Sequence, residues 1–309
     1  ASLLRVDDDE FTKFNSLFHF TETPDQLEAI ESIRKDMALI KPMNRVLCGD
    51  VGFGKTEVAM RSAFISISSG KQVIILCPST VLSEQHYESF LERFKSFAVN
   101  TKIINRHVNR KNKDDIVNDF NKGNVDILIG THALFTSDIN FSNTGLLVVD
   151  EEHKFGIKQK DIIKSKQENI HILYLSATPI PRTMNFIFSG LKEFSFLHTP
   201  PSNRISIKSF LKVENLQLFK EAISREVARG GQCFIVQNDI SKMEFLKRNI
   251  SSILPEITMD IAHGKLNKND ISKVMRDFDT GVLDVLICTT IVEMGLDIPN
   301  ANTILIIDA

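Results

Sequence analysis

Short apolar runs alternate with longer, more polar stretches along the first two thirds of the chain. The runs are rich in Val, Ile and Leu, and each predicts a buried strand. They cover residues 46–48, 73–77, 101–105, 125–129, 146–149 and 170–175. The stretches between them predict helices at 57–68, 80–94 and 111–121. This alternation is typical of a parallel sheet covered by helices on both faces, so we predict an α/β fold.

The pattern stops around residues 198–204 and then starts again. Pro200 and Pro201 can neither continue a helix nor lie in a central strand, so we predict a linker at 199–206. One α/β domain is therefore expected at 20–198 and a second at 207–309. The second has predicted helices at 216–228, 245–253 and 268–278 and predicted strands at 233–236, 257–262, 285–287 and 303–307.

Further signals mark the ends of these units. Ser241 and Glu244 fit a capping box that would begin the helix at 245–253. The sequence stops directly after its last strand, where an α/β unit normally continues into a covering helix, so we expect an incomplete second domain. Residues 1–19 combine an acidic cluster with Phe and Leu at helix-like spacing, and they predict either a linker or a short docking helix.

Composition narrows the classes of protein. Hydrophobic residues make up 42% and charged residues 25% of the chain, as in globular domains. No apolar run reaches the ~18 residues of a membrane helix. The acidic N-terminal stretch does not resemble a signal peptide, and four cysteines without metal-binding spacing indicate core residues in a reducing compartment. We therefore expect a cytoplasmic protein, and the net charge of −2 limits any nucleic-acid contact to a local patch.

A glycine-rich loop joins the strand at 46–48 to the helix at 57–68. Its sequence, Gly49-Asp50-Val51-Gly52-Phe53-Gly54-Lys55-Thr56, fits G-x-x-x-x-G-K-[ST]. The glycines allow backbone N–H groups to surround a polyphosphate at the helix N-terminus. Lys55 would reach the β- and γ-phosphates, and the Thr56 hydroxyl would bind Mg²⁺. The loop therefore predicts a nucleoside triphosphate site rather than a simple turn.

A helix start precedes this loop. Thr23 can cap it, Pro24 suits its first position, and Gln26 stands where a capping box needs it. Alternatively, Gln26 would form hydrogen bonds with the edge of an adenine base while Phe20 stacks on its ring. The sequence is compatible with both roles of Gln26, and its side chain can serve both.

An acidic box, Asp150-Glu151-Glu152-His153, follows the strand at 146–149. A carboxylate at such a strand end can hold Mg²⁺, and the next can orient and deprotonate the attacking water. We assign the metal to Asp150 and the base to Glu151, against the alternative of an acidic helix start favoured by the helix dipole.

Polar residues follow three further strands. Ser176-Ala177-Thr178 is either a polar loop or a coupling element that senses the γ-phosphate, and Arg182 would contact nucleic acid, bridge the domains or be solvated. In the second domain, the hydroxyls of Thr289 and Thr290 suit phosphodiester contacts. Glu293, Gly295 and Asp297 would face the nucleotide, and His263, at another strand end, is expected to contact DNA.

These blocks resemble, in their order, the superfamily 2 helicase and translocase motors. Within them, residues 49–61, 150–156 and 178–183 are similar to the family of bacterial transcription-repair coupling factors. The related RecG family typically differs where Phe53 and Glu152 stand. The resemblance implies two RecA-like domains with ATP and Mg²⁺ in the cleft between them. It implies base contacts from Phe20 and Gln26, coupling roles for Glu152 and His153, and DNA contacts from Pro78, Thr80, Gly130, Thr131, Thr289 and Thr290.

By this resemblance, the chain is the motor of a double-stranded DNA translocase in transcription-coupled repair, with RNA polymerase and excision-repair proteins as partners. The family's arginine finger and partner-binding modules lie outside this sequence, so we expect ATP binding but weak hydrolysis. An arginine finger supplies about 10³- to 10⁵-fold in rate in related NTPases. The alternatives are a RecG-like fork-remodelling helicase and a nucleotide-gated DNA-binding module.

Overall fold

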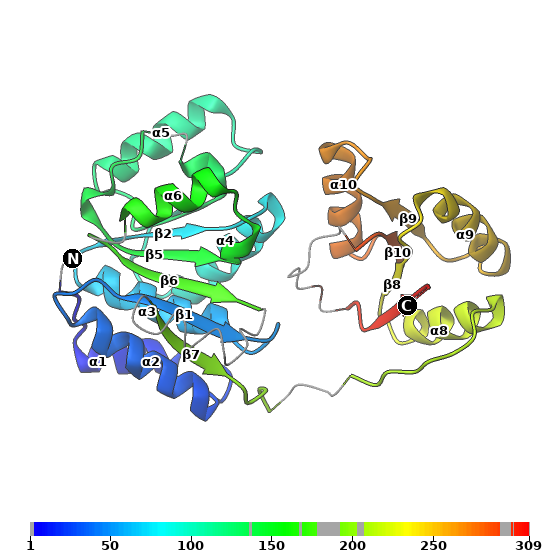
Figure 1. The fold of residues 1–309 in the computed structure, drawn as a ribbon, viewed down its shortest axis with the longest axis horizontal. Helices are drawn as coiled ribbons and strands as arrows, with labels where there is room; N and C mark the ends of the chain where they lie inside the picture. The colour runs from blue at the N-terminus through cyan, green and yellow to red at the C-terminus, as the bar shows by residue number, and fades with distance from the viewer. Residues whose placement is uncertain are drawn as a thin grey trace. The chain divides into compact units, whose positions relative to one another are not determined.

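The computed structural model describes residues 3–135, 138–166, 169–177, 192–202, 207–290, 298 and 300–308. The chain divides into two compact units, Ala1–Ser206 and Ile207–Ala309 (Figure 1). Each unit is an α/β domain around a parallel sheet, as predicted. Among the described residues, no helix is long and apolar enough to cross a membrane.

The first unit is built on a sheet of seven described strands in the order β3-β4-β2-β5-β6-β1-β7, with every pairing parallel. The strands are β1 (Asn44–Gly49), β2 (Gln72–Leu76), β3 (Thr101–Ile104), β4 (Ile127–Gly130), β5 (Thr144–Asp150), β6 (His171–Ser176) and β7 (Glu193–Leu197). Because all run the same way, the loops that follow them meet at one edge. Ligands of open parallel sheets bind at this edge.

Helices cover both faces of this sheet. They are α1 (Asp8–Ser16), α2 (Pro24–Met37), α3 (Lys55–Ser68), α4 (Thr80–Phe94), α5 (Arg110–Asn121) and α6 (Ile157–Lys166). Successive side chains of a strand point to opposite faces, so Ile75 belongs to a core with residues of α1 to α4. Its neighbour Ile74 belongs to a second core with residues of α5 and α6.

The N-terminal segment packs on the first unit. Asp7 caps α1 through its side chain, which accepts from the N–H groups of Asp9 and Glu10. Phe14 is fully buried and stacks on Phe64 of α3, with ring centroids 4.3 Å apart. Residues 8–16 are therefore a docked helix in this structure.

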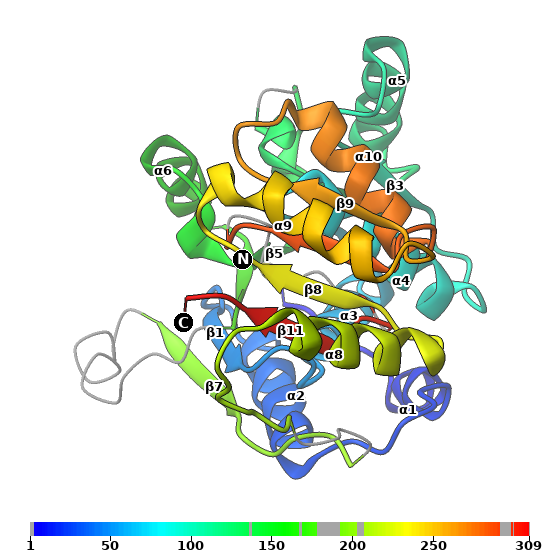
Figure 2. The same ribbon diagram turned by 90° about the vertical axis from the view of Figure 1, so that its right-hand side faces the viewer.

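The second unit has four described strands in the order β11-β8-β10-β9, also parallel. They are β8 (Cys233–Val236), β9 (Met259–Ala262), β10 (Val285–Cys288) and β11 (Thr303–Ile306). Helices α8 (Leu216–Ala228) and α9 (Ile240–Ile253) pack on one face and α10 (Lys268–Asp279) on the other (Figure 2).

The predicted capping box at the start of α9 is wrong. The helix begins at Ile240, and its cap is Asp239, whose Oδ1 accepts from the Ser241 N–H at 3.0 Å. Aspartate is among the best capping residues, so the earlier acid takes the position that the sequence assigned to Ser241. The strand β7 and the helix α6 were not predicted.

Candidate nucleotide-binding site

The glycine loop lies between the end of β1 and the start of α3. Gly52 and Gly54 both have a φ of +79°, a backbone conformation that residues with a Cβ rarely adopt. The N-cap residue of α3 is Gly54, which has no side chain that could occupy the N–H groups of the first turn. The first N–H groups of a helix have no partner within it and can point at an anion. The loop therefore has the backbone geometry that a phosphate requires.

Lys55 lies within this loop. Its Nζ donates to the carbonyl oxygens of Gly49 at 2.6 Å and Asp50 at 3.0 Å. Burial lowers the pKa of Lys55, while the carboxylates of Glu151, Asp150 and Asp50 act in the opposite direction. The acidic residues after β5 therefore lie within electrostatic reach of the lysine after β1.

The sheet order explains this proximity. β6 pairs with β1 on one side and with β5 on the other, so the loops after β1 and β5 flank the end of β6. Asp150 is buried, and its Oδ2 lies 3.0 Å from Nε2 of His86 on α4. The distance of 64 residues between them left no sequence signal for this contact.

Glu151 is held in an unusual conformation. Its φ of 51° lies in the left-handed region, which non-glycine residues rarely adopt outside special sites. Its Oε1 accepts from the Ala177 N–H at 2.8 Å, and its Oε2 lies 3.2 Å from Nδ1 of His153. Both carboxylate oxygens are thus oriented by neighbours at the ends of β5 and β6.

The available donors fit Mg²⁺. This ion prefers oxygen ligands and keeps several waters, so it needs only one or two protein groups beside a phosphate. The Thr56 hydroxyl and the buried Asp150 carboxylate are such groups. In the described part of the chain, no group of three or more His, Cys, Asp or Glu forms a denser metal site.

Gln26 connects the helix start to the phosphate loop. The capping box is confirmed: Gln26 Oε1 accepts from the Thr23 N–H at 2.9 Å, and Thr23 Oγ1 accepts from the Gln26 N–H at 3.3 Å. In addition, Gln26 Nε2 donates to the Phe53 carbonyl at 2.8 Å, which the sequence did not indicate. Phe20 is 63% exposed, and its ring lies 5.5 Å from that of Phe18.

The expected coupling residues lie within or beside the acidic box. Glu152 forms an ion pair with Lys192 at 2.8 Å. The Lys192 ammonium lies 3.7 Å from the centroid of the Tyr174 ring, on β6. Ser176 ends β6, next to the Ala177 N–H that orients Glu151.

The residues predicted to contact DNA follow strand ends. Pro78 and Thr80 come after β2, and the buried Gly130 and Thr131 come at the end of β4, at the same edge as the phosphate loop. A Cβ on Gly130 would clash with the Ile104 carbonyl, so its role in packing is sufficient to explain the glycine.

In the second unit, the corresponding residues follow β10 and β9. Thr289 is buried, and its Oγ1 has no hydrogen-bond partner among the described residues. Thr290 is exposed, and its N–H donates to Asn238 Oδ1 at 3.3 Å. His263 follows β9, and its buried Nδ1 has no partner within the part of the chain that the structure describes. The predicted residues Thr178, Arg182, Glu293, Gly295 and Asp297 lie outside the described residues.

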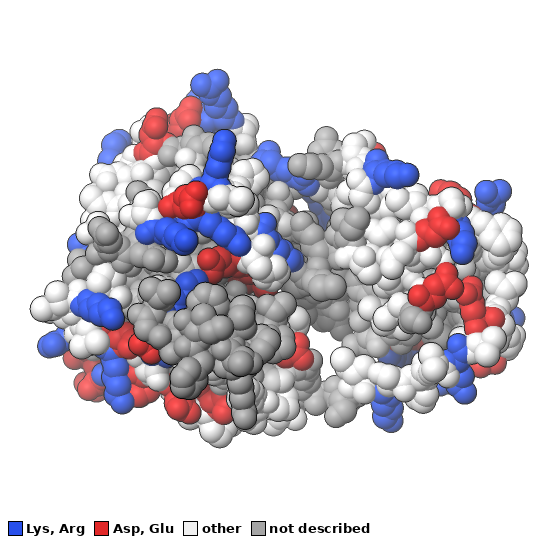
Figure 3. Space-filling model, viewed as in Figure 1, with Lys and Arg blue, Asp and Glu red and all other residues white. Residues whose placement is uncertain are grey.

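Surface charges of both signs are interspersed. On the face drawn in Figure 3, Lys and Arg side chains lie among Asp and Glu on both units. This agrees with the net charge of −2 and with a local rather than a general nucleic-acid contact.

Comparisons with known proteins agree with the fold and the candidate nucleotide site. Residues 23–187 match the DEAD/DEAH box helicase family, and residues 214–309 match the helicase conserved C-terminal domain. The chain is 45% identical over 302 residues to the transcription-repair-coupling factor of Haemophilus influenzae, covering 98% of this chain and 26% of the relative. The Escherichia coli protein of the same name is 43% identical over 300 residues, covering 97% and 26%. The chain thus spans about a quarter of these relatives.

Solved structures share this fold. The structure of RecG bound to a three-way DNA junction matches with a TM-score of 0.84 and 32% identity, covering 97% of this chain and 40% of that one. Yeast Dbp5 bound to RNA and ADP BeF3 matches with a TM-score of 0.65 at 18% identity, covering 95% and 79%, and this likeness shows the fold alone. The resemblance to two-domain superfamily 2 motors is confirmed.

Proposed function

The chain belongs to the DEAD/DEAH box helicase family, and from this premise we propose that it is the ATP-driven motor of a double-stranded DNA translocase. The observation that supports this most directly is that Lys55 lies within electrostatic reach of Asp150 and Glu151, because the loops after β1 and β5 flank the end of β6. A phosphate-binding lysine beside two carboxylates is the arrangement that phosphoryl transfer to water requires.

In this proposal, different residues of the first unit bind the phosphates, hold the metal ion and activate the water. The N–H groups of the glycine loop and the Lys55 ammonium bind the phosphates, and Thr56 and Asp150 hold Mg²⁺, which neutralises phosphate charge when bound. Glu151 orients the attacking water and accepts its proton. The Ala177 N–H that binds Glu151 Oε1 supports this role, because it leaves the carboxylate in a defined orientation.

We also propose that the ends of several strands contact the DNA backbone. The residues involved are Pro78, Thr80, Gly130, Thr131, Arg182, His263, Thr289 and Thr290. Hydroxyls and backbone groups position a nucleic acid without reading its sequence, as a translocase requires. Glu152, His153, Ser176 and Thr178 would transmit the state of the nucleotide. Glu293, Gly295 and Asp297 would complete the nucleotide site from the second domain.

The whole protein would act in transcription-coupled repair, on stalled RNA polymerase and with excision-repair proteins. The higher identity to transcription-repair-coupling factors than to RecG favours this over fork remodelling. A nucleotide-gated DNA-binding module is the second candidate for the chain at this length, since it spans about a quarter of those relatives.

ATP hydrolysis with and without DNA tests the proposal. The rate should rise with linear duplex DNA, most clearly in a form continued past Ala309, and Glu151→Gln should abolish it while leaving ATP binding intact. Stimulation by branched DNA alone would support fork remodelling. ATP binding without stimulated hydrolysis in either form would support the nucleotide-gated module. In a salt series, log K for DNA should fall linearly with log[salt], and a flat response would exclude backbone binding.

A further inference from the structure

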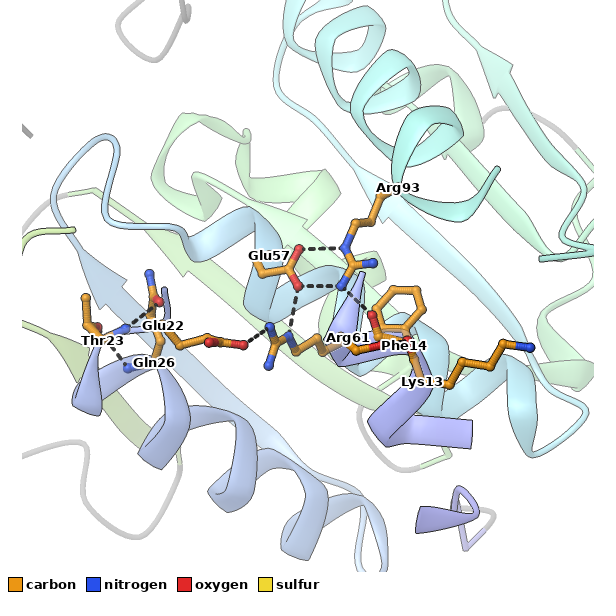
Figure 4. A network of polar contacts seen from close by, with 9 residues as sticks. Lys13, Phe14, Glu22, Thr23, Gln26, Glu57, Arg61 and Arg93 are labelled. Atoms are coloured by element: carbon orange, nitrogen blue, oxygen red, sulfur yellow. Dashed lines mark hydrogen bonds and ion pairs between the residues drawn. The ribbon is translucent and has the colours of Figure 1, made fainter. Parts of the chain in front are cut away.

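A buried cluster of four charged residues connects the N-terminal segment to α3 and α4 (Figure 4). Glu57 Oε1 accepts from Arg61 Nε and from Arg93 Nη2, each at 2.8 Å, and Glu57 Oε2 accepts from Arg93 Nε at 3.0 Å. Arg61 Nη2 also donates to Glu22 Oε1 at 2.5 Å. We call Glu22, Glu57, Arg61 and Arg93 the arginine–glutamate cluster.

The burial of this cluster is unusual. The side chain of Arg61 is only 2% exposed, and burying a guanidinium is costly unless it is paired and hydrogen-bonded. Two acids and two arginines balance the charge. Burial alone would raise the pKa of Glu22, but the hydrogen bond and charge of Arg61 hold it below its usual value. Glu22 is therefore ionised at neutral pH.

The cluster also holds aromatic rings of the N-terminal segment. The guanidinium carbons of Arg61 and Arg93 lie 5.3 and 5.8 Å from the centroid of the Phe18 ring, within range of a cation–π contact. Phe18 in turn packs against the exposed Phe20, with centroids 5.5 Å apart. Phe20 lies between Phe18 and Glu22 in sequence, so the cluster holds the chain on both sides of it.

We propose that Arg61 and Glu22 are positioning residues for the nucleotide base. The helix that begins with Lys55 and Thr56 carries Arg61 less than two turns further along. Through Glu22 and Phe18, Arg61 fixes Phe20 relative to the loop that would bind the phosphates. The contact of Gln26 with the Phe53 carbonyl makes a second connection to the same loop. Phe20, which we expect to stack on the base, and the phosphate site thus share one rigid support.

This inference rests on the proposed function, because it requires a nucleotide in the loop. A purely structural fastening of α1 is the competing interpretation, and the chain offers a matched control for it. Asp8 forms an ion pair with Arg34 of α2, and Arg34 lies over the Phe11 ring at 5.6 Å. This ion pair also fastens α1, but Asp8 and Arg34 are not among the residues that hold Phe18 and Glu22, which flank Phe20 in sequence.

The experiment compares Glu22→Ala with Asp8→Ala in the 309-residue chain. Each protein is titrated with ATP and with inorganic tripolyphosphate, which lacks the base. Glu22→Ala should weaken ATP binding about tenfold, the order of one lost base–aromatic stack, and leave tripolyphosphate binding unchanged. Asp8→Ala should change neither.

The chain has no tryptophan, so Phe20→Trp supplies a single indole. Its emission should respond to ATP, and the response should be smaller when Phe20→Trp is combined with Glu22→Ala.

Three results would overturn the proposal: equal affinities in Glu22→Ala and the unchanged chain, equal losses for both ligands, or the same loss of ATP binding in Asp8→Ala. Circular dichroism establishes that each variant is folded, and Phe18→Leu, which keeps an apolar side chain, should repeat the effect of Glu22→Ala. Lys55→Ala separates this inference from the proposed function. It should weaken both ligands, and if it weakens neither, the nucleotide site itself is wrong.

Discussion

Gly54 and Gly52 share a backbone conformation but differ in their surroundings, and this difference predicts unequal effects of alanine. Both have a φ of +79°. A Cβ on Gly52 would meet no atom of the described residues within 4 Å apart from those of its two chain neighbours, whereas a Cβ on Gly54 would lie closer than 3.0 Å to Gln26 Nε2. Gly52→Ala should therefore cost only the strain of a left-handed residue, about 1 kcal/mol.

Gly54→Ala should cost more, because Gln26 must move. Gln26 is 4% exposed, so its amide cannot exchange its partners for water where it lies. Losing the hydrogen bond to the Phe53 carbonyl costs about 1 kcal/mol, and losing the bond to the Thr23 N–H costs about 1 kcal/mol more. Together with the strain, we expect about 3 kcal/mol for Gly54→Ala.

Urea denaturation followed by tyrosine emission measures this difference. Both tyrosines, Tyr87 and Tyr174, belong to the first unit, so the signal reports that unit alone. The extra 2 kcal/mol should lower the midpoint of Gly54→Ala by about 1 M relative to Gly52→Ala, for an m-value of about 2 kcal/mol/M. In the Gln26→Ala background, the two glycine substitutions should cost the same. Equal midpoints in the original background would refute the reasoning.

Three further predictions follow from the contacts of the described residues. Glu57→Ala leaves two buried guanidinium groups short of a partner and should destabilise the first unit by about 3–5 kcal/mol in the same urea assay; a loss below 1 kcal/mol would contradict the burial argument. The pKa of Asp25 is lowered chiefly because the Thr199 N–H donates to it, so this contact should be complete at neutral pH and be lost as the pH falls through that lowered pKa. The Thr199 amide chemical shift should follow this titration, and Asp25→Asn should remove it. Burial raises the pKa of the Cys233 and Cys288 thiols to about 12, so a thiol reagent at pH 7.5 should label them only after urea is added, and rapid labelling of the folded chain would be inconsistent with this.

Local sequence was sufficient for much of the fold. Runs of Val, Ile and Leu identify the strands that are buried on both faces, because a central parallel strand has no polar face. The helix at 80–94 was predicted with the bounds that α4 has. The capping box of Thr23 and Gln26 was also read correctly, since its partners lie three residues apart. The glycine loop was identified because its strand and helix adjoin it in sequence.

Tertiary structure decided the rest. β7 was missed because its exposed and buried residues are mixed, and its pairing with β1 joins segments about 150 residues apart. The error at α9 arose where Asp239 competes with Ser241 for the same cap, a choice that the local pattern leaves open. Sequence could neither select His86 as the partner of Asp150 nor reveal that Arg61 is buried. A helical arginine normally predicts a solvated side chain, and Arg61 can be buried because Glu22 and Phe18 from another segment join Glu57 of its own helix around it.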